Sequence, residues 1–229
     1  MKSTSALLST LLIGVAVAAV TPTASAFGLG NLTAAIPGGG GSSTHSVSAG
    51  DIDTFLKTAQ DANQMIDTSS QYIFKAVGDQ KDIAAQEAKR AAANGIADPK
   101  EKAAAIQQIN ADDATMVQKA IASKDAQDKI NAMSKEQLNS FGNAAFTFML
   151  GVLKDKQLAN DSTALVSGVT SNPMLISRLP ELKDVVSSVS SQVVNSAKIG
   201  DGLIQLAKAG KIAALPASAS EQPKEVNAI

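Results

Sequence analysis

The chain has 229 residues, one histidine and no cysteine, and its 20 basic and 21 acidic residues give a formal net charge of −1 at pH 7. This near balance gives no sign of the clustered basic face that nucleic-acid binding requires, so we expect no nucleic-acid partner. Without cysteine the chain forms no disulfide, and its stability has to come from packing alone.

The N-terminus has the features of a signal peptide covering residues 1–26. Lys2 precedes an uncharged, mostly apolar run over residues 6–20. This run is shorter than the about 20 apolar residues that a membrane-spanning helix needs. It is followed by the small-x-small pattern of Ala24 and Ala26 that signal peptidase recognises. We therefore expect export to the periplasm or the cell exterior, as a soluble chain after cleavage. The alternative is an uncleaved N-terminal anchor helix.

Residues 27–47 are uncharged and rich in glycine and serine, with His45 as the single histidine of the chain. Such a composition buries too little apolar surface to offset the entropy lost on ordering, which predicts a flexible linker. One histidine and no cysteine exclude Ser-His-Asp and Cys-His catalysis, structural zinc sites, di-iron bundle sites and covalent haem attachment. We therefore expect no His- or Cys-based catalytic or metal site and no cofactor.

Residues 48–212 are predicted to form one all-α domain, an up-and-down helical bundle. Capping-box patterns begin at Ser48, Asp98 and Ser134, where side chains can satisfy the free backbone N–H groups of a helix start. Between these marks apolar residues recur at helical spacing, and no run alternates with the period of a strand. Glycines expected to end helices lie at Gly78, Gly95, Gly200 and Gly210.

Residues 79–131 are rich in alanine, glutamine, lysine and aspartate, and their apolar residues are sparse. This pattern predicts helices with a narrow apolar stripe and a wide solvated face, arranged as a long, coiled-coil-like helical hairpin arm. Asp112 and Asp113 form a tight carboxylate pair within it. Adjacent helical residues point in different directions, and Asp113 follows Asn110 by three positions. We therefore expect Asp113 to cap a helix start rather than to share a catalytic site.

The segment 141–153 contains 13 residues without charge and three of the six phenylalanines. A helix that is apolar around most of its circumference has to be surrounded, which predicts the centre of the bundle, within a helix over 134–158. The alternative is a contact with a lipid, a hydrophobic ligand or a membrane surface, since 13 residues are too few to span a bilayer. For both interpretations the candidate contact residues are Phe141, Phe146, Phe148, Met149 and Val152.

The tail, residues 213–229, is expected to be disordered. Taken together, these patterns indicate a non-enzymatic interaction or structural protein of the cell envelope that binds a protein partner or itself. An enzyme would have to work through carboxylates, hydroxyls or lysines alone. The alternative function is a carrier of a lipid or another hydrophobic ligand, or a membrane-interacting helical protein, using the 141–153 helix.

The exported chain should begin at Phe27, because Ala24 and Ala26 supply the small side chains that signal peptidase requires. An intact-mass measurement on exported protein checks this start. Recovery of the precursor from the membrane with Met1 retained would contradict it.

Overall fold

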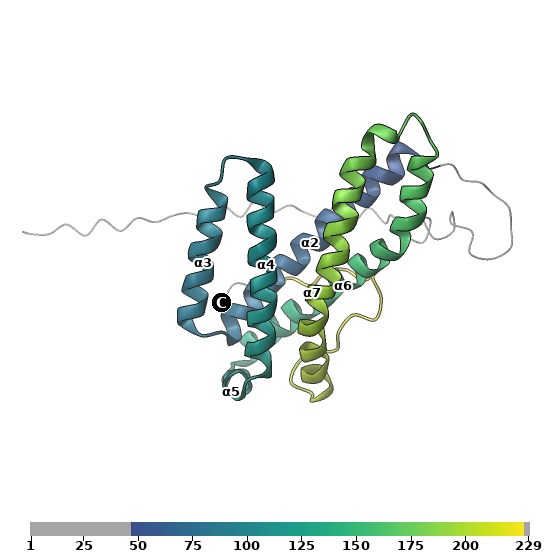
Figure 1. Cartoon of the computed structure of the whole chain (residues 1–229). Coiled ribbons are helices and arrows are strands. Elements are labelled where there is room, and N and C mark those ends of the chain that lie inside the picture. The colour runs from purple at the N-terminus through teal and green to yellow at the C-terminus, as the bar shows by residue number, and fades with distance from the viewer. Residues whose placement is uncertain (1–46, 227–229) are drawn as a thin grey trace, which may run out of the picture.

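The computed structural model describes residues 47–226, apart from the side chains at positions 99, 100 and 103 (Figure 1). The predicted signal peptide and the predicted linker up to residue 46 lie outside the described residues. The described part contains six α-helices, one short 3-10 helix and no strand, which confirms the predicted all-α bundle. The elements are α2 (Ala49–Val77), α3 (Gln80–Asn94), α4 (Pro99–Ala122), α5 (Lys124–Ala132), α6 (Lys135–Thr170), η1 (Ile176–Arg178) and α7 (Leu179–Lys208).

The longest helix, α6, packs antiparallel against α2, and the two approach closely where α6 has glycine. A Cβ atom on Gly151 would lie 2.7 Å from the Ile66 side chain and 3.0 Å from the carbonyl oxygen of Ala62. Near the end of α6, a Cβ atom on Gly168 would lie 2.2 Å from Val47, which precedes α2. The start of α2 therefore lies at the end of α6, and neither glycine leaves room for a side chain in this packing.

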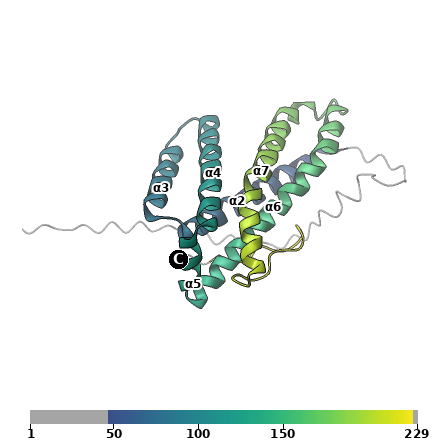
Figure 2. The ribbon, with the colours of Figure 1, turned by 60° about the horizontal axis from the view of Figure 1, so that its bottom comes forward.

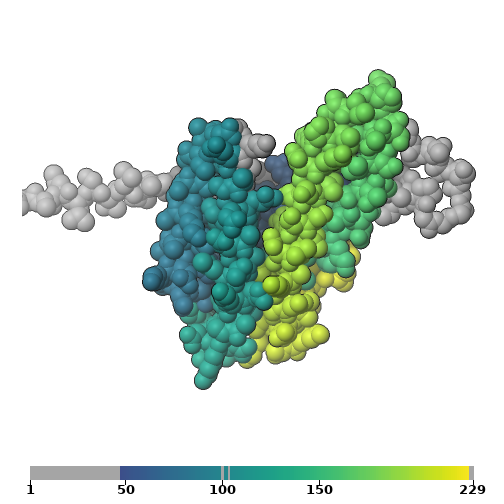
Figure 3. All heavy atoms as spheres, in the orientation of Figure 1, coloured from purple at the N-terminus to yellow at the C-terminus, as the bar shows by residue number. Residues whose placement is uncertain are grey.

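The helices α3 and α4 form a hairpin beside the α6–α7 pair, with α3 on the outside (Figures 1 and 2). The inner helix, α4, packs against α2 and runs parallel to α7. Gln107 donates a hydrogen bond to Ser188 at 3.1 Å, and the Ile121 side chain covers Gly202. Toward their first residues α4 and α7 diverge, which leaves a notch between the two pairs in the space-filling view (Figure 3).

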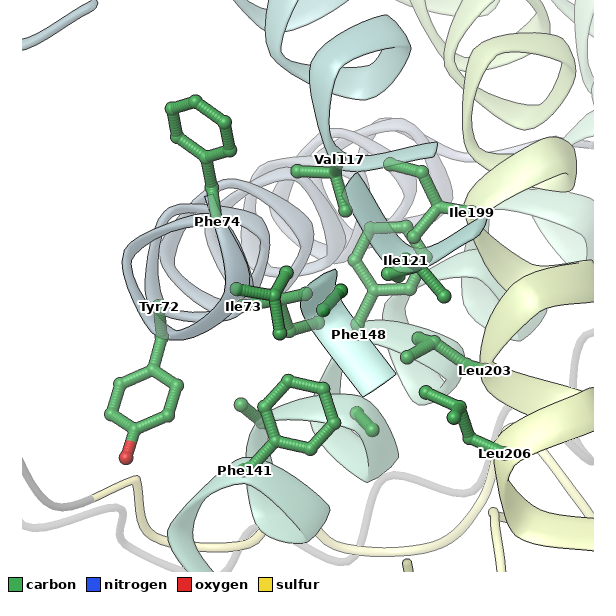
Figure 4. Packing of buried hydrophobic residues seen from close by; sticks show 14 of the residues in the cluster. Tyr72, Ile73, Phe74, Val117, Ile121, Phe141, Phe148, Ile199, Leu203 and Leu206 are labelled. Carbon is green, nitrogen blue, oxygen red and sulfur yellow. The ribbon is translucent and has the colours of Figure 1, made fainter. Parts of the chain in front are cut away.

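Two hydrophobic clusters hold these helices together. In the larger cluster Phe141 and Phe148 of α6 meet side chains from α2, α4 and α7, while Tyr72 and Phe74 point away from its centre (Figure 4). The smaller cluster lies between the first half of α2, the second half of α6 and the first half of α7. Its buried members are Ile52, Phe55, Ala59, Leu158, Leu165, Val169, Leu182 and Val189.

The predicted helix boundaries hold at most positions. Ser48 and Ser134 form complete capping boxes, and Gly78 and Gly95 are the C-cap residues of α2 and α3. The expectation that Gly200 ends a helix is wrong, because α7 continues through it. Gly200 is buried, and a Cβ atom there would lie 3.2 Å from the sulfur of Met149, so the glycine serves close helix packing instead.

Phe148→Ala should lower the free energy of unfolding by about 3–5 kcal/mol, the usual cost of truncating a buried aromatic residue and leaving a cavity. Phe148 has 0% of its surface exposed and lies in the larger cluster. Denaturant unfolding of the wild type and the variant measures the difference. The control is Val194→Ala, at a position that is 69% exposed on α7, which should change stability by less than about 0.5 kcal/mol. A loss below about 1 kcal/mol for Phe148→Ala would contradict its role in the core.

Candidate functional site

The apolar segment 141–153 lies in the first half of α6, with different residues facing different surroundings. Phe141, Phe146 and Phe148 are buried, whereas Met149 and Val152 are partly exposed beside the larger cluster. Phe141 and Phe148 point into that cluster (Figure 4). Phe146 points elsewhere, toward the chain that follows α7.

The residues after α7 lie against α6, which differs from the expectation of a disordered tail. Gly210, with φ of 69°, reverses the chain, and the N–H of Lys211 bonds back to the carbonyl oxygen of Leu206 at 3.0 Å. Ile212 is then buried in the larger cluster. Ala213 lies beside Gly142, at ordinary van der Waals distance from the position that a Cβ atom on this glycine would take. The tail, which is yellow in Figure 1, therefore folds back against α6.

The tail meets α6 a second time on a surface made by Asn143, Phe146 and Thr147, which we call the tail face. The Thr147 hydroxyl accepts a hydrogen bond from the N–H of Lys224 at 3.1 Å and donates one to its carbonyl oxygen at 3.0 Å. The Asn143 amide donates to the carbonyl oxygen of Glu225 at 2.9 Å. The Lys224 ammonium lies 4.0 Å from the centre of the Phe146 ring, a cation–π contact. The tail face thus binds a stretch of non-helical backbone, with one cation as a side-chain contact.

At the opposite end of α6, the turn over residues 171–178, which we call the tip, exposes large apolar side chains. Met174 is 89% exposed and Ile176 is 53% exposed. Several hydrogen bonds fix the backbone of the tip, among them the N–H of Met174 to the side chain of Asn172 at 3.1 Å. Arg178 ties the tip to α2 and α7 through Asp53 at 2.9 Å and Glu181 at 3.0 Å.

A mostly buried ion-pair network joins α3 to α2 and α4. Arg90 of α3 bonds Asp67 of α2 at 3.0 Å and also contacts the buried carboxylate of Asp113 on α4. Its guanidinium further donates to Asn110 at 3.1 Å. Burial raises the pKa of Asp113 although Arg90 opposes the change. The contacts of this network tie the hairpin of α3 and α4 to the rest of the bundle.

The prediction that Asp113 caps a helix start is wrong. The helix α4 runs unbroken through this position, so no unsatisfied backbone N–H group of a helix start is present there for the carboxylate to accept. Asp113 binds Arg90 instead. This partner is 23 residues away in the sequence and comes near only when α3 folds back on α4.

Asp155, in the middle of α6, is fully buried, and neither of its carboxylate oxygens has a hydrogen-bond partner. Burial raises the pKa of Asp155 from its ordinary 3.8 to about 7, because the charged form loses its hydration. At the preceding residue, burial lowers the pKa of Lys154, and the charge of Asp61 opposes the change. A carboxyl group with such a pKa can hold or release a proton near neutral pH, but its burial separates it from any substrate in solution.

Over residues 47–226 no group of three or more histidine, cysteine, aspartate or glutamate side chains is placed to hold a metal ion. No helix in this part of the chain is long and apolar enough to cross a membrane.

Comparisons with protein-family models, with curated proteins and with solved structures give no significant match to this chain. Its function therefore has to be argued from the chemistry of its own surfaces, of which the tip and the tail face are the two described above.

The free energy of unfolding should depend on pH through Asp155. Its pKa is higher in the folded chain than in the unfolded chain, so the folded state binds the proton more tightly, and stability falls as the pH rises from about 4 to above 7. Asp155→Asn removes this titration. At pH 8.5 the variant should be more stable than the wild type by up to about 4 kcal/mol, which corresponds to a difference of about three between the folded and unfolded pKa of Asp155. At pH 4 the two proteins should have nearly equal free energies of unfolding.

Denaturant unfolding at both pH values measures this effect. Asp201→Asn, at an exposed position of α7, is the matched control and should leave the pH profile unchanged. Parallel profiles for the wild type and Asp155→Asn would show that Asp155 is not a buried acid.

Proposed function

We propose that this chain is an exported, non-enzymatic helical protein that binds another protein through the tip. The observation that carries the proposal is the exposure of Met174 and Ile176, two large apolar side chains two positions apart on one turn. Single exposed apolar residues are common on soluble proteins, but a pair on a projecting turn offers a joint contact surface. The export signal is the sequence pattern at Ala24 and Ala26 described above.

The hydrogen bonds of the tip support this proposal because they hold the backbone that carries the two side chains in place before any partner binds. Asn172 accepts the N–H of Met174 through its side chain and the N–H of Leu175 through its backbone. Arg178 adds ion pairs to both neighbouring helices. A rigid turn loses little conformational entropy on binding, and a flexible methionine can adapt to an apolar pocket.

The charges around the tip favour a protein surface over an anionic membrane. Arg178 is paired with two carboxylates, Asp53 and Glu181, so this group of three carries a net negative charge. An anionic lipid surface attracts clustered basic residues and repels such a group. The burial of Phe141 and Phe148 in the core likewise supports protein binding over lipid carriage by the 141–153 helix.

A photocrosslinking amino acid at position 174, introduced into the exported protein in the cells that make it, tests the proposal. We expect a discrete adduct with a protein, either another chain or a second copy, which mass spectrometry identifies. The same amino acid at position 194 is the control, because Val194 is also exposed but lies on α7 away from the tip. Equal adducts from both positions, or none from position 174, would contradict the proposal.

The double variant Met174→Ser, Ile176→Ser should weaken binding of the identified partner at least tenfold, since exposed apolar contacts supply most of the proposed affinity. Its melting temperature should match that of the wild type because neither side chain is buried. Binding of the wild type to anionic vesicles, lost in the double variant, would instead assign the tip to a membrane surface.

A further inference from the structure

The Thr147 hydroxyl makes different hydrogen bonds from those of four other threonines in the helices. Thr54, Thr58, Thr115 and Thr170 each donate their hydroxyl to the carbonyl oxygen four residues earlier in their own helix. Thr147 instead donates to, and accepts from, the backbone of Lys224. It is only 7% exposed, so its hydroxyl is committed to the tail rather than to solvent or to its own helix.

The tail face recognises its ligand mainly through the backbone. All three hydrogen bonds, two from Thr147 and one from Asn143, go to backbone groups of the tail. Side-chain selectivity comes from Lys224 over the Phe146 ring and from Val226, which packs against the larger cluster. The face therefore fits a non-helical segment with a lysine two positions before a β-branched apolar residue.

The seated part of the tail is short and is joined to α7 by a long connection. Between the contact of Ala213 with Gly142 and the contacts of Lys224 with Thr147, most side chains of the connection are exposed. Closing such a loop costs conformational entropy, which is offset by the packing of Leu215 against the larger cluster and by hydrogen bonds from the N–H groups of Ala217 and Ser218 to the Glu221 carboxylate. A segment from another chain that makes the same contacts competes with the tail without distorting the helices.

We infer that the tail face is an interaction site at which the tail of a second copy replaces the chain's own tail. The second copy is the occupant because its residues 224–226 reproduce every contact that the face makes. Exchange of an identical element between copies needs no new interface, since the seated contacts are the same within one chain and between two. This site lies in the first half of α6 and does not depend on the tip.

Two complementary variants test the exchange. Thr147→Val disables the face and releases an intact tail, while Lys224→Glu with Val226→Asp disables the tail and leaves the face open. Mixed together, the two variants should form a one-to-one complex in sedimentation velocity, and each alone should sediment as a monomer. A mixture that sediments as the sum of its parts would overturn the inference.

Matched substitutions control for unrelated effects. Thr147→Ser keeps the hydroxyl and a seated tail that its own face retains, so it should pair with the tail-disabled variant more weakly than Thr147→Val does. Thr115→Val changes a helical threonine whose hydroxyl bonds Ala111 within α4, and it should pair with the tail-disabled variant no more strongly than the wild type does. The tip double variant should leave the complementation unchanged, which separates failure at this site from failure of the proposed function.

A synthetic peptide of residues 217–226, labelled with fluorescein, keeps the test decisive if Thr147→Val does not fold. Measured by fluorescence anisotropy, the tail-disabled chain should bind this peptide at least tenfold more tightly than the wild type, whose own tail competes. Adding Asn143→Ala to the tail-disabled chain should weaken peptide binding. Equal binding by the wild type and the tail-disabled chain, or no binding by either, would overturn the inference.

Discussion

The structure depends on one continuous stripe of α6 along which every neighbouring helix packs. Buried residues recur there at alternating intervals of three and four, the spacing that keeps one side of a long helix facing its partners. The stripe consists of Phe141, Ala144, Phe148, Gly151, Asp155, Leu158, Ser162, Leu165 and Val169. Its glycine brings α2 close enough for both clusters to share the same pair of helices, and α7 covers the stripe from the other side. The hairpin of α3 and α4 then attaches mainly to α2 and α7.

Two buried carboxyl groups on or near this framework offset the cost of losing their hydration in different ways. Asp113 keeps a charged partner in Arg90, so breaking that pair would leave a buried charge. Asp155 occupies a position of the stripe itself, and neither of its carboxylate oxygens has a hydrogen-bond partner. Because the charged form loses its hydration on burial, the group instead retains its proton up to a higher pH. A polar residue on an apolar stripe lowers stability, but it also disfavours helix registers that would place it against other apolar side chains.

The sequence predicts local features of this fold well and distant pairings poorly. The capping boxes at Ser48 and Ser134 and the uncharged segment around Phe148 follow from neighbouring residues, and the structure has them. The partner of Asp113 could not be predicted, because the four-residue connection between α3 and α4 and the packing of their faces decide which carboxylate meets Arg90. Asp155 could have been noticed, since it continues the three-and-four spacing from Phe148. The seating of the tail left no signal, because Thr147 and Asn143 bind backbone groups that every residue carries.

One of the two proposed surfaces lies on the first half of α6, and the other lies just beyond the last residue of this helix. Thr147 and Thr170 are separated by a helical rise of about 35 Å, so a partner on the tip and a tail on the tail face do not compete for the same side chains. Both surfaces nevertheless rest on the stripe, and Asp155 lies between them, about 12 Å along the axis from Thr147. Ionisation of this buried carboxyl would weaken the packing of α6 on its neighbours, which is the framework that positions Phe146 and Thr147 at one end and the tip at the other. The stability of that stripe, rather than direct contact, is therefore the physical route by which pH could act on both surfaces together.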